Sequence, residues 1–174
     1  MRVLWITPKW TLPSIDGARV ATEKLLTNTY ASDIKIDYLC FGNQDDIVDI
    51  ENMKKSWDIN EIFSYRRELP ASKFAKLFYY LFSLMLKPKT PLTFSSFVTK
   101  RNRKITQDIL SKSNYDVIVL DGLHLAGVLP QDSHEFLVGN SKVVLRAHNI
   151  ETDLWDRSYR DEKNFLKKLS LIHI

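Results

Sequence analysis

Short apolar runs rich in β-branched residues alternate along this chain with amphipathic segments. Runs of about four to eight such residues, bounded by turn-forming residues, are typical of buried strands. The pattern predicts five strands, over Arg2–Thr7, Ile34–Phe41, Ile59–Ser64, Val117–Leu120 and Val143–Ala147. Helices are predicted to begin after Gly17 and to cover Asp45–Lys55, Ser72–Leu86, Phe94–Lys112, Leu123–Leu129 and Ile150–Lys168.

This alternation of strand and helix predicts the fold class. Strands separated by helices pair in parallel, and a parallel sheet needs helices on both faces to cover it. Right-handed crossovers leave few other topologies. We therefore expect an α/β fold, a Rossmann-like parallel sheet with helices on both faces. Ser14 or Asp16 is expected to cap the first helix, because both residue types accept hydrogen bonds from a helix amino terminus.

The size of the chain and its cysteine content limit the number of domains and the kinds of site that it can contain. A chain of 174 residues with 44% hydrophobic content can form one core, so we expect one domain. Cys40 is the only cysteine, which excludes an internal disulfide and a zinc or iron–sulfur site built from thiolates. No run reaches the roughly 20 apolar residues of a membrane span, and the amino terminus is unlike a secretory signal. A cytoplasmic protein is expected, either free or peripheral at the inner face of the cell membrane.

Positive charge is concentrated in one part of the chain. The net charge is +4, but ten lysines and arginines lie between Arg66 and Lys104 against Glu68 alone. Such a field favours an anionic partner. The aromatic segment 73–86 inside it has two interpretations, an interfacial membrane anchor or a buried helix beside a solvated basic neighbour. The cations expected to meet anionic lipid are Lys73, Lys76, Lys100, Arg101, Arg103 and Lys104. No nucleic acid partner is expected, because aromatic platforms of the RNA-recognition type are not apparent.

His148 is the first candidate for chemistry. It follows the predicted strand Val143–Ala147, and ligands of open parallel sheets bind beyond the carboxyl ends of the strands. The alternative is a histidine at the strand end satisfied by the backbone. Asn149 and Glu151 follow as candidate binding residues, but both also suit the first turn of a helix. His124, after the strand Val117–Leu120, could contact an acceptor or be a loop histidine without a ligand.

The loop after the first strand is a second candidate site. Gly17 is its only glycine, and the loop is longer than the glycine-rich turn that binds NAD or FAD, which argues against those cofactors. Gly17 at a helix amino terminus, with Arg19 one step into the helix, could still bind a phosphate or a sugar hydroxyl. The alternative is a turn glycine and a solvated surface charge. No metal is expected, because His148 and Glu151 lack further ligands at a convincing spacing.

Three segments, taken in order, resemble one enzyme family. They are the first strand with its loop up to Asp16-Gly17-Ala18-Arg19, the run from Tyr115 to His124, and Leu145 to Glu151 with Trp155. Their order and spacing resemble the amino-terminal domain of family-4 retaining glycosyltransferases of the GT-B fold, in particular bacterial members that build cell-surface polysaccharides. The resemblance covers residues 1–168.

The resemblance implies an enzyme that transfers a sugar from a nucleotide-sugar to a glycan or lipid-linked acceptor, with no cofactor besides that co-substrate. It implies that this domain holds the acceptor and that a second domain holds most of the donor. His148 would contact the transferred sugar, and Asp16 with Gly17 would lie near the donor phosphates, although family members often carry a second glycine where Asp16 stands. Transfer through an oxocarbenium-like state would depend on electrostatics and positioning.

The end of the chain bears on domain organisation. Leu169 to Ile174 match the conceptual translation of a common sequencing adaptor, so we expect a non-native tail and native sequence ending near Lys168. The donor domain would then be absent and the fragment inactive alone. Two further functions stay open: a nucleotide-dependent oxidoreductase and a non-catalytic, peripheral membrane-binding module.

Overall fold

A computed structural model of the chain describes residues 1–29, 33–42, 50–66, 96–130 and 140–147. It also describes short pieces at 72, 74–75, 78–79, 82, 94, 137–138, 159–161 and 163.

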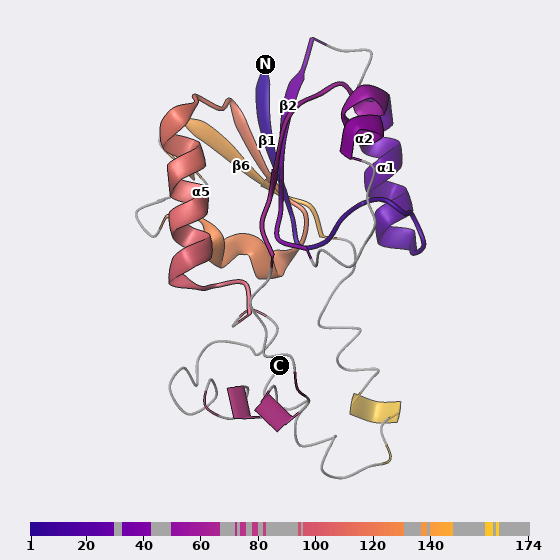
Figure 1. Ribbon diagram of the computed structural model, residues 1–174, viewed down its shortest axis with the longest axis vertical. Helices are drawn as coiled ribbons and strands as arrows, with labels where there is room; N and C mark the ends of the chain where they lie inside the picture. The colour runs from indigo at the N-terminus through magenta and orange to yellow at the C-terminus, as the bar shows by residue number, and fades with distance from the viewer. Residues whose placement is uncertain are drawn as a thin grey trace.

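The described strands form one sheet in the order β3-β2-β1-β4-β6-β5 (Figure 1). Five of them run in parallel: β1 (Arg2–Thr7), β2 (Lys35–Cys40), β3 (Ile59–Ser64), β4 (Val117–Leu120) and β6 (Ser141–Leu145). The short edge strand β5 (Leu137–Val138) pairs with β6 in the antiparallel sense. The central order 3-2-1-4 is that of a doubly wound sheet, so the chain has the predicted Rossmann-like α/β fold.

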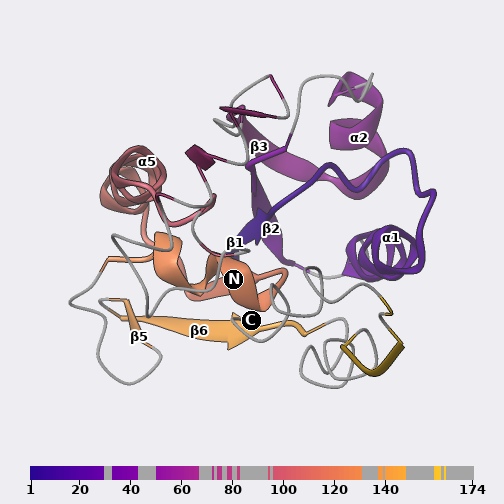
Figure 2. The same cartoon turned by 90° about the horizontal axis from the view of Figure 1, so that it is seen from below.

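Helices cover both faces of the sheet, as Figure 2 shows. Helices α1 (Gly17–Thr29) and α2 (Ile50–Trp57) pack on one face. Helix α5 (Lys100–Lys112) and the 3-10 helix η1 (Leu123–Val128) cover the other. Because side chains alternate along a strand, the even positions of β1 pack toward α5 and the odd positions toward α1 and α2. This double burial is the reason that β1 is continuously apolar.

The predicted strand and helix boundaries can be compared with those observed. The predicted bounds of β1, β3 and β4 are confirmed. The prediction for β6 was displaced, since the strand begins and ends two residues before Val143–Ala147. Strand β5 was missed because two residues carry no periodic signal.

Two helix predictions were also wrong in part. Helix α5 begins at Lys100 instead of Phe94, because the Thr99 side chain accepts a hydrogen bond from the backbone N–H of Asn102 and caps the helix there. Helix α2 continues to Trp57, whose side chain is buried, instead of ending at Lys55. The predicted closing helix 150–168 lies almost entirely outside the described residues, although Tyr159, Arg160 and Asp161 are helical.

A buried carboxylate ties the strands together at the amino end of the sheet. Asp37 is fully buried and accepts hydrogen bonds from Arg2 Nη2 at 2.7 Å, Tyr115 Oη at 2.9 Å and Asn60 Nδ2 at 2.6 Å. The hydrogen bond to Asp37 is the main cause of the raised pKa of Arg2, and burial is the main cause of the raised pKa of Tyr115. A buried charge satisfied this fully has a structural role.

No helix in the described part of the chain combines the length and the apolar character needed to cross a membrane.

Candidate functional site

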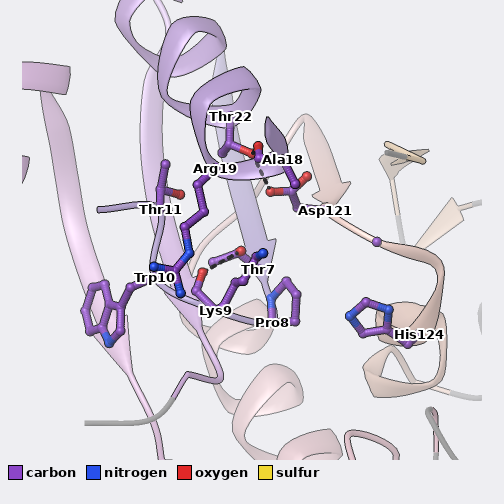
Figure 3. Close-up of a pocket in the computed structure, with 11 residues that line it drawn as sticks. Thr7, Pro8, Lys9, Trp10, Thr11, Ala18, Arg19, Thr22, Asp121 and His124 are labelled. Carbon is purple, nitrogen blue, oxygen red and sulfur yellow. Dashed lines mark hydrogen bonds between the residues drawn. The ribbon is translucent and has the colours of Figure 1, made fainter. Parts of the chain in front are cut away.

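The strand order reverses between β1 and β4. The chain leaves β1 toward β2 and β3 on one side and returns to β4 on the other, which opens a crevice at the carboxyl ends of the two central strands. A pocket of about 200 Å³ lies there (Figure 3). Its lining consists of Thr7, Pro8, Lys9, Trp10, Thr11, Ala18, Arg19, Thr22, Asp121, Gly122 and His124. Crevices at this position are the usual ligand sites of open parallel sheets.

The loop after β1 forms one wall and is held firmly against the sheet. The Thr7 hydroxyl donates to the Lys9 carbonyl at 2.9 Å, and the Thr11 hydroxyl lies 2.8 Å from the Tyr38 hydroxyl on β2. Trp10 is 3% exposed and stacks on the Tyr38 ring, with 6.3 Å between centroids. This wall is therefore built before any ligand arrives.

Asp16 caps helix α1 beside the pocket. Its carboxylate accepts hydrogen bonds from the backbone N–H of Arg19 at 2.9 Å and from Lys9 Nζ at 2.6 Å. The bond from Lys9 is the main cause of the lowered pKa of Asp16. Of the two predicted caps, Asp16 is confirmed, whereas the Ser14 hydroxyl donates to the Thr11 carbonyl. The predicted contact of Asp16 with substrate stays a prediction.

Gly17 and Arg19 differ in their position relative to the pocket. Gly17 is the first residue of α1, is not among the lining residues of the pocket, and has open space where a Cβ would lie. Arg19 lines the pocket and is only 9% exposed, so the alternative of a solvated surface charge is wrong. Its Nη1 donates to the Pro13 carbonyl at 3.1 Å, and its Nε lies 3.5 Å from the Asp16 carboxylate. Figure 3 shows its side chain extending from α1 past Thr11.

His124 reaches the pocket from the opposite side, out of η1. Gly122, just before it, has a φ of +129°, and a Cβ there would lie 2.8 Å from the His124 ring. The His124 ring lies 4.8 Å from that of Phe97, centroid to centroid. The turn that brings the imidazole to the pocket therefore requires a glycine. His124 lines the pocket, and its contact with an acceptor stays a prediction.

The floor of the pocket contains a charged network that the sequence analysis did not single out as a site. Arg146 Nη1 donates to Asp121 Oδ1 at 2.6 Å and lies 2.6 Å from the Thr22 hydroxyl. The Thr22 hydroxyl is in turn 3.0 Å from Asp121 Oδ2. Asp121 and Arg146 each follow the last residue of a strand, and those strands are parallel neighbours. An acidic and a basic residue at matched strand ends is the signal that could have revealed the pair.

The remaining predicted residues lie beyond the described part of the chain. The described stretch that contains β6 ends at Ala147, one position before His148. Asn149 and Glu151 are likewise outside the described residues, so all three stay predictions. No group of three His, Cys, Asp or Glu side chains comes together within the described ranges in a way that could hold a metal ion.

Comparisons with known proteins identify no family for this chain. No protein-family model and no curated protein matches the chain. Among solved structures it is similar to the C-terminal domain of a hydrogenase from Pyrococcus furiosus, at 10% identity and a TM-score of 0.49, over 83% of this chain and 90% of that one.

Proposed function

We propose that the chain is the acceptor-side domain of a retaining glycosyltransferase, which transfers a sugar from a nucleotide-sugar to a glycan or lipid-linked acceptor. The observation that carries the proposal is the pocket at the carboxyl ends of β1 and β4, which the cations of Lys9 and Arg19 and the imidazole of His124 line. The resemblance of the flanking motifs to family-4 enzymes supports the same function.

The side chains of the pocket suit a sugar and its phosphate. Lys9 and Arg19 place positive charge where a phosphate leaving group would gain negative charge during transfer. The buried hydroxyls of Thr7, Thr11 and Thr22 are bonded within the protein and fix the shape of the walls that a sugar would meet.

In this proposal, His124 contacts the acceptor. An imidazole can donate a hydrogen bond to an acceptor hydroxyl or accept one from it. Its place opposite Arg19 across the pocket would let the acceptor lie between the two. His148 keeps the role that the resemblance implies, contact with the transferred sugar. In a protein that also carries a donor domain, His148→Ala should lower turnover far more than it lowers the free energy of unfolding.

Ligand binding by the 174-residue chain tests the proposal. In a titration followed by amide NMR shifts, short glycans and nucleotide-sugars should perturb the lining residues Thr7, Lys9, Gly122 and His124. Lys9→Gln should weaken binding at least about threefold, since it removes a cation near the ligand. Lys24→Gln is the matched control, because Lys24 is exposed on α1 and is not among the lining residues.

Two results would contradict the proposal. One is that NADH perturbs these amides while glycans and nucleotide-sugars do not, which would favour the oxidoreductase. The other is that none of these ligands binds. Turnover of a nucleotide-sugar by the purified chain would instead contradict the division of acceptor and donor between two domains.

A further inference from the structure

Three phenylalanines are exposed at helical spacing outside the pocket. Phe74, Phe78 and Phe82 are all helical, and their exposed fractions are 77%, 69% and 63%. The Ser72 hydroxyl accepts a hydrogen bond from the Ala75 N–H at 3.0 Å, as a helix cap does. Successive members of this set are four positions apart in the sequence, the spacing that places side chains on one face of a helix. We call these three residues the phenylalanine row.

Other large apolar side chains are exposed as well, and Ile15 is as exposed as Phe74, at 77%. Single exposed apolar residues are ordinary, but three exposed aromatic side chains at helical spacing favour a surface that another molecule covers. The interpretation of segment 73–86 as a buried helix is wrong for these three side chains.

Exposed basic residues occupy the amino end of α5. Lys100, Arg101 and Lys104 are exposed in the first turns of α5. Arg101 Nη1 donates to the Arg66 carbonyl at 3.3 Å, which holds this end of α5 beside the chain that leaves β3. The amino end of α5 therefore lies at the edge of the sheet where the parallel strands end.

The phenylalanine row lies at the same end of the molecule. In Figures 1 and 2 the helical pieces that contain it lie beyond the carboxyl ends of the strands, on the side of α5 and not of α1. Of the described cations, Lys100, Arg101 and Lys104 at the amino end of α5 lie at this end of the sheet. Aromatic rings and positive charge thus share one end of the protein.

We propose that this end of the protein docks on an anionic lipid surface, with the phenylalanine row entering the headgroup boundary and the cations at the amino end of α5 contacting lipid phosphates. Exposed aromatic side chains accompanied by cations are the pattern of an interfacial membrane helix. The switch-point pocket opens at the same end of the sheet, so docking would bring it to a lipid-linked acceptor. The docking proposal does not depend on the proposed enzyme activity.

The test uses the whole chain and vesicles of two compositions, phosphatidylcholine alone and phosphatidylcholine mixed with phosphatidylglycerol. The chain should co-sediment with the mixed vesicles, and its partition constant should fall at least about tenfold in Phe74→Ser/Phe78→Ser/Phe82→Ser and in Lys100→Gln/Arg101→Gln/Lys104→Gln. Arg103 is left unchanged because its Nε donates to the Gly127 carbonyl at 2.9 Å, so its substitution would disturb η1.

Matched controls separate docking from general effects. Leu25→Ser removes an exposed apolar side chain on α1, and Lys24→Gln/Lys35→Gln/Lys55→Gln removes three exposed positive charges elsewhere. Both controls should bind vesicles like the wild type. Circular dichroism should be unchanged in the phenylalanine variant, because its altered side chains are exposed.

Three outcomes would overturn the proposal. Vesicle binding by the phenylalanine variant at the wild-type level would exclude the row as the contact. Equal binding to both vesicle types would exclude the role of the cations. Failure to bind vesicles, with self-association in light scattering that the phenylalanine variant abolishes, would assign the row to contact with a second copy of the chain. Glycan binding at the pocket is measured separately, so each proposal can fail without the other.

Discussion

Asp121 and Arg146 form a 2.6 Å ion pair across the carboxyl ends of two neighbouring parallel strands, and only 3% and 17% of their side-chain surfaces are exposed. The strand register explains the pairing: Leu120 lies opposite Leu145, so the next residue of each strand reaches the same level. The backbone N–H of Arg146 donates to the Leu120 carbonyl at 2.9 Å and continues the ladder. The pair stabilises the floor of the pocket. Arg146 also lies two positions before His148 in the chain.

Removal of one partner of this pair should be costly. Arg146→Met would leave the buried Asp121 carboxylate without its cation, and we expect a loss of about 3 kcal/mol in the free energy of unfolding, measured by urea denaturation. The double variant Asp121→Leu/Arg146→Met should recover most of that loss, because no uncompensated charge stays buried. A loss below about 1 kcal/mol in Arg146→Met would show that the pair is well solvated.

Gly122 should not tolerate a side chain. Gly122→Ala combines a positive φ with a Cβ 2.8 Å from the His124 ring, so we expect about 1–3 kcal/mol of destabilisation and a changed ring-current shift of the His124 protons beside Phe97. Gly17→Ala is the control, since nothing lies within 4 Å of its added Cβ. It should leave stability unchanged or raise it by up to about 1 kcal/mol. Similar costs at both glycines would contradict this account.

The Asp16 cap should give the protein an acid-dependent component of stability. Because the folded-state pKa of Asp16 is lowered, its contribution is fully present above the unfolded-state pKa of about 3.9 and is lost as the pH falls through the folded value. Asp16→Asn keeps a good capping residue but loses the charge facing Lys9. The difference in unfolding free energy between wild type and Asp16→Asn should therefore be larger at about pH 6 than at about pH 3.

A second Asp16 variant separates the cap from the charge. Asp16→Ala should cost about 1 kcal/mol more than Asp16→Asn at low pH, where only the cap distinguishes them. If the difference between wild type and Asp16→Asn did not change with pH, the hydrogen bond from Lys9 would not be formed in solution.

Two tyrosines allow a comparison of hydrogen bonds to charged and neutral acceptors. The Tyr115 hydroxyl donates to the buried Asp37 carboxylate, whereas that of Tyr38 meets the neutral Thr11 hydroxyl. Tyr115→Phe should cost about 1.5–3 kcal/mol and Tyr38→Phe about 1 kcal/mol in thermal or urea unfolding. The reverse order would mean that the other donors to Asp37 compensate for the lost hydroxyl.

Much of the fold could be predicted because its signals are local. The bounds of β1, β3 and β4 follow from short apolar runs, and the capping of α1 by Asp16 follows from residue type and position. The errors have local causes too. The amino end of α5 was misplaced because Ser95, Ser96 and Thr99 are all residue types that can cap, and only the observed geometry selects Thr99.

The candidate site could be predicted less well. Arg19 and His124 were named from their positions and both line the pocket. The contributions of Thr22, Asp121 and Arg146 depend on contacts between residues 25 to 124 positions apart in the chain, which no local pattern encodes.

The sequence by itself determined the alternation of strands and helices, and with it the parallel sheet, because burial on two faces requires continuous apolar strands and the helices that cover them. The tertiary structure alone decided which polar residues meet at the switch point, that Arg19 is buried, and that the phenylalanine row is exposed. The reason is physical: hydrophobic periodicity specifies the face on which a residue lies, whereas its partner and its final exposure depend on which distant segment packs against that face.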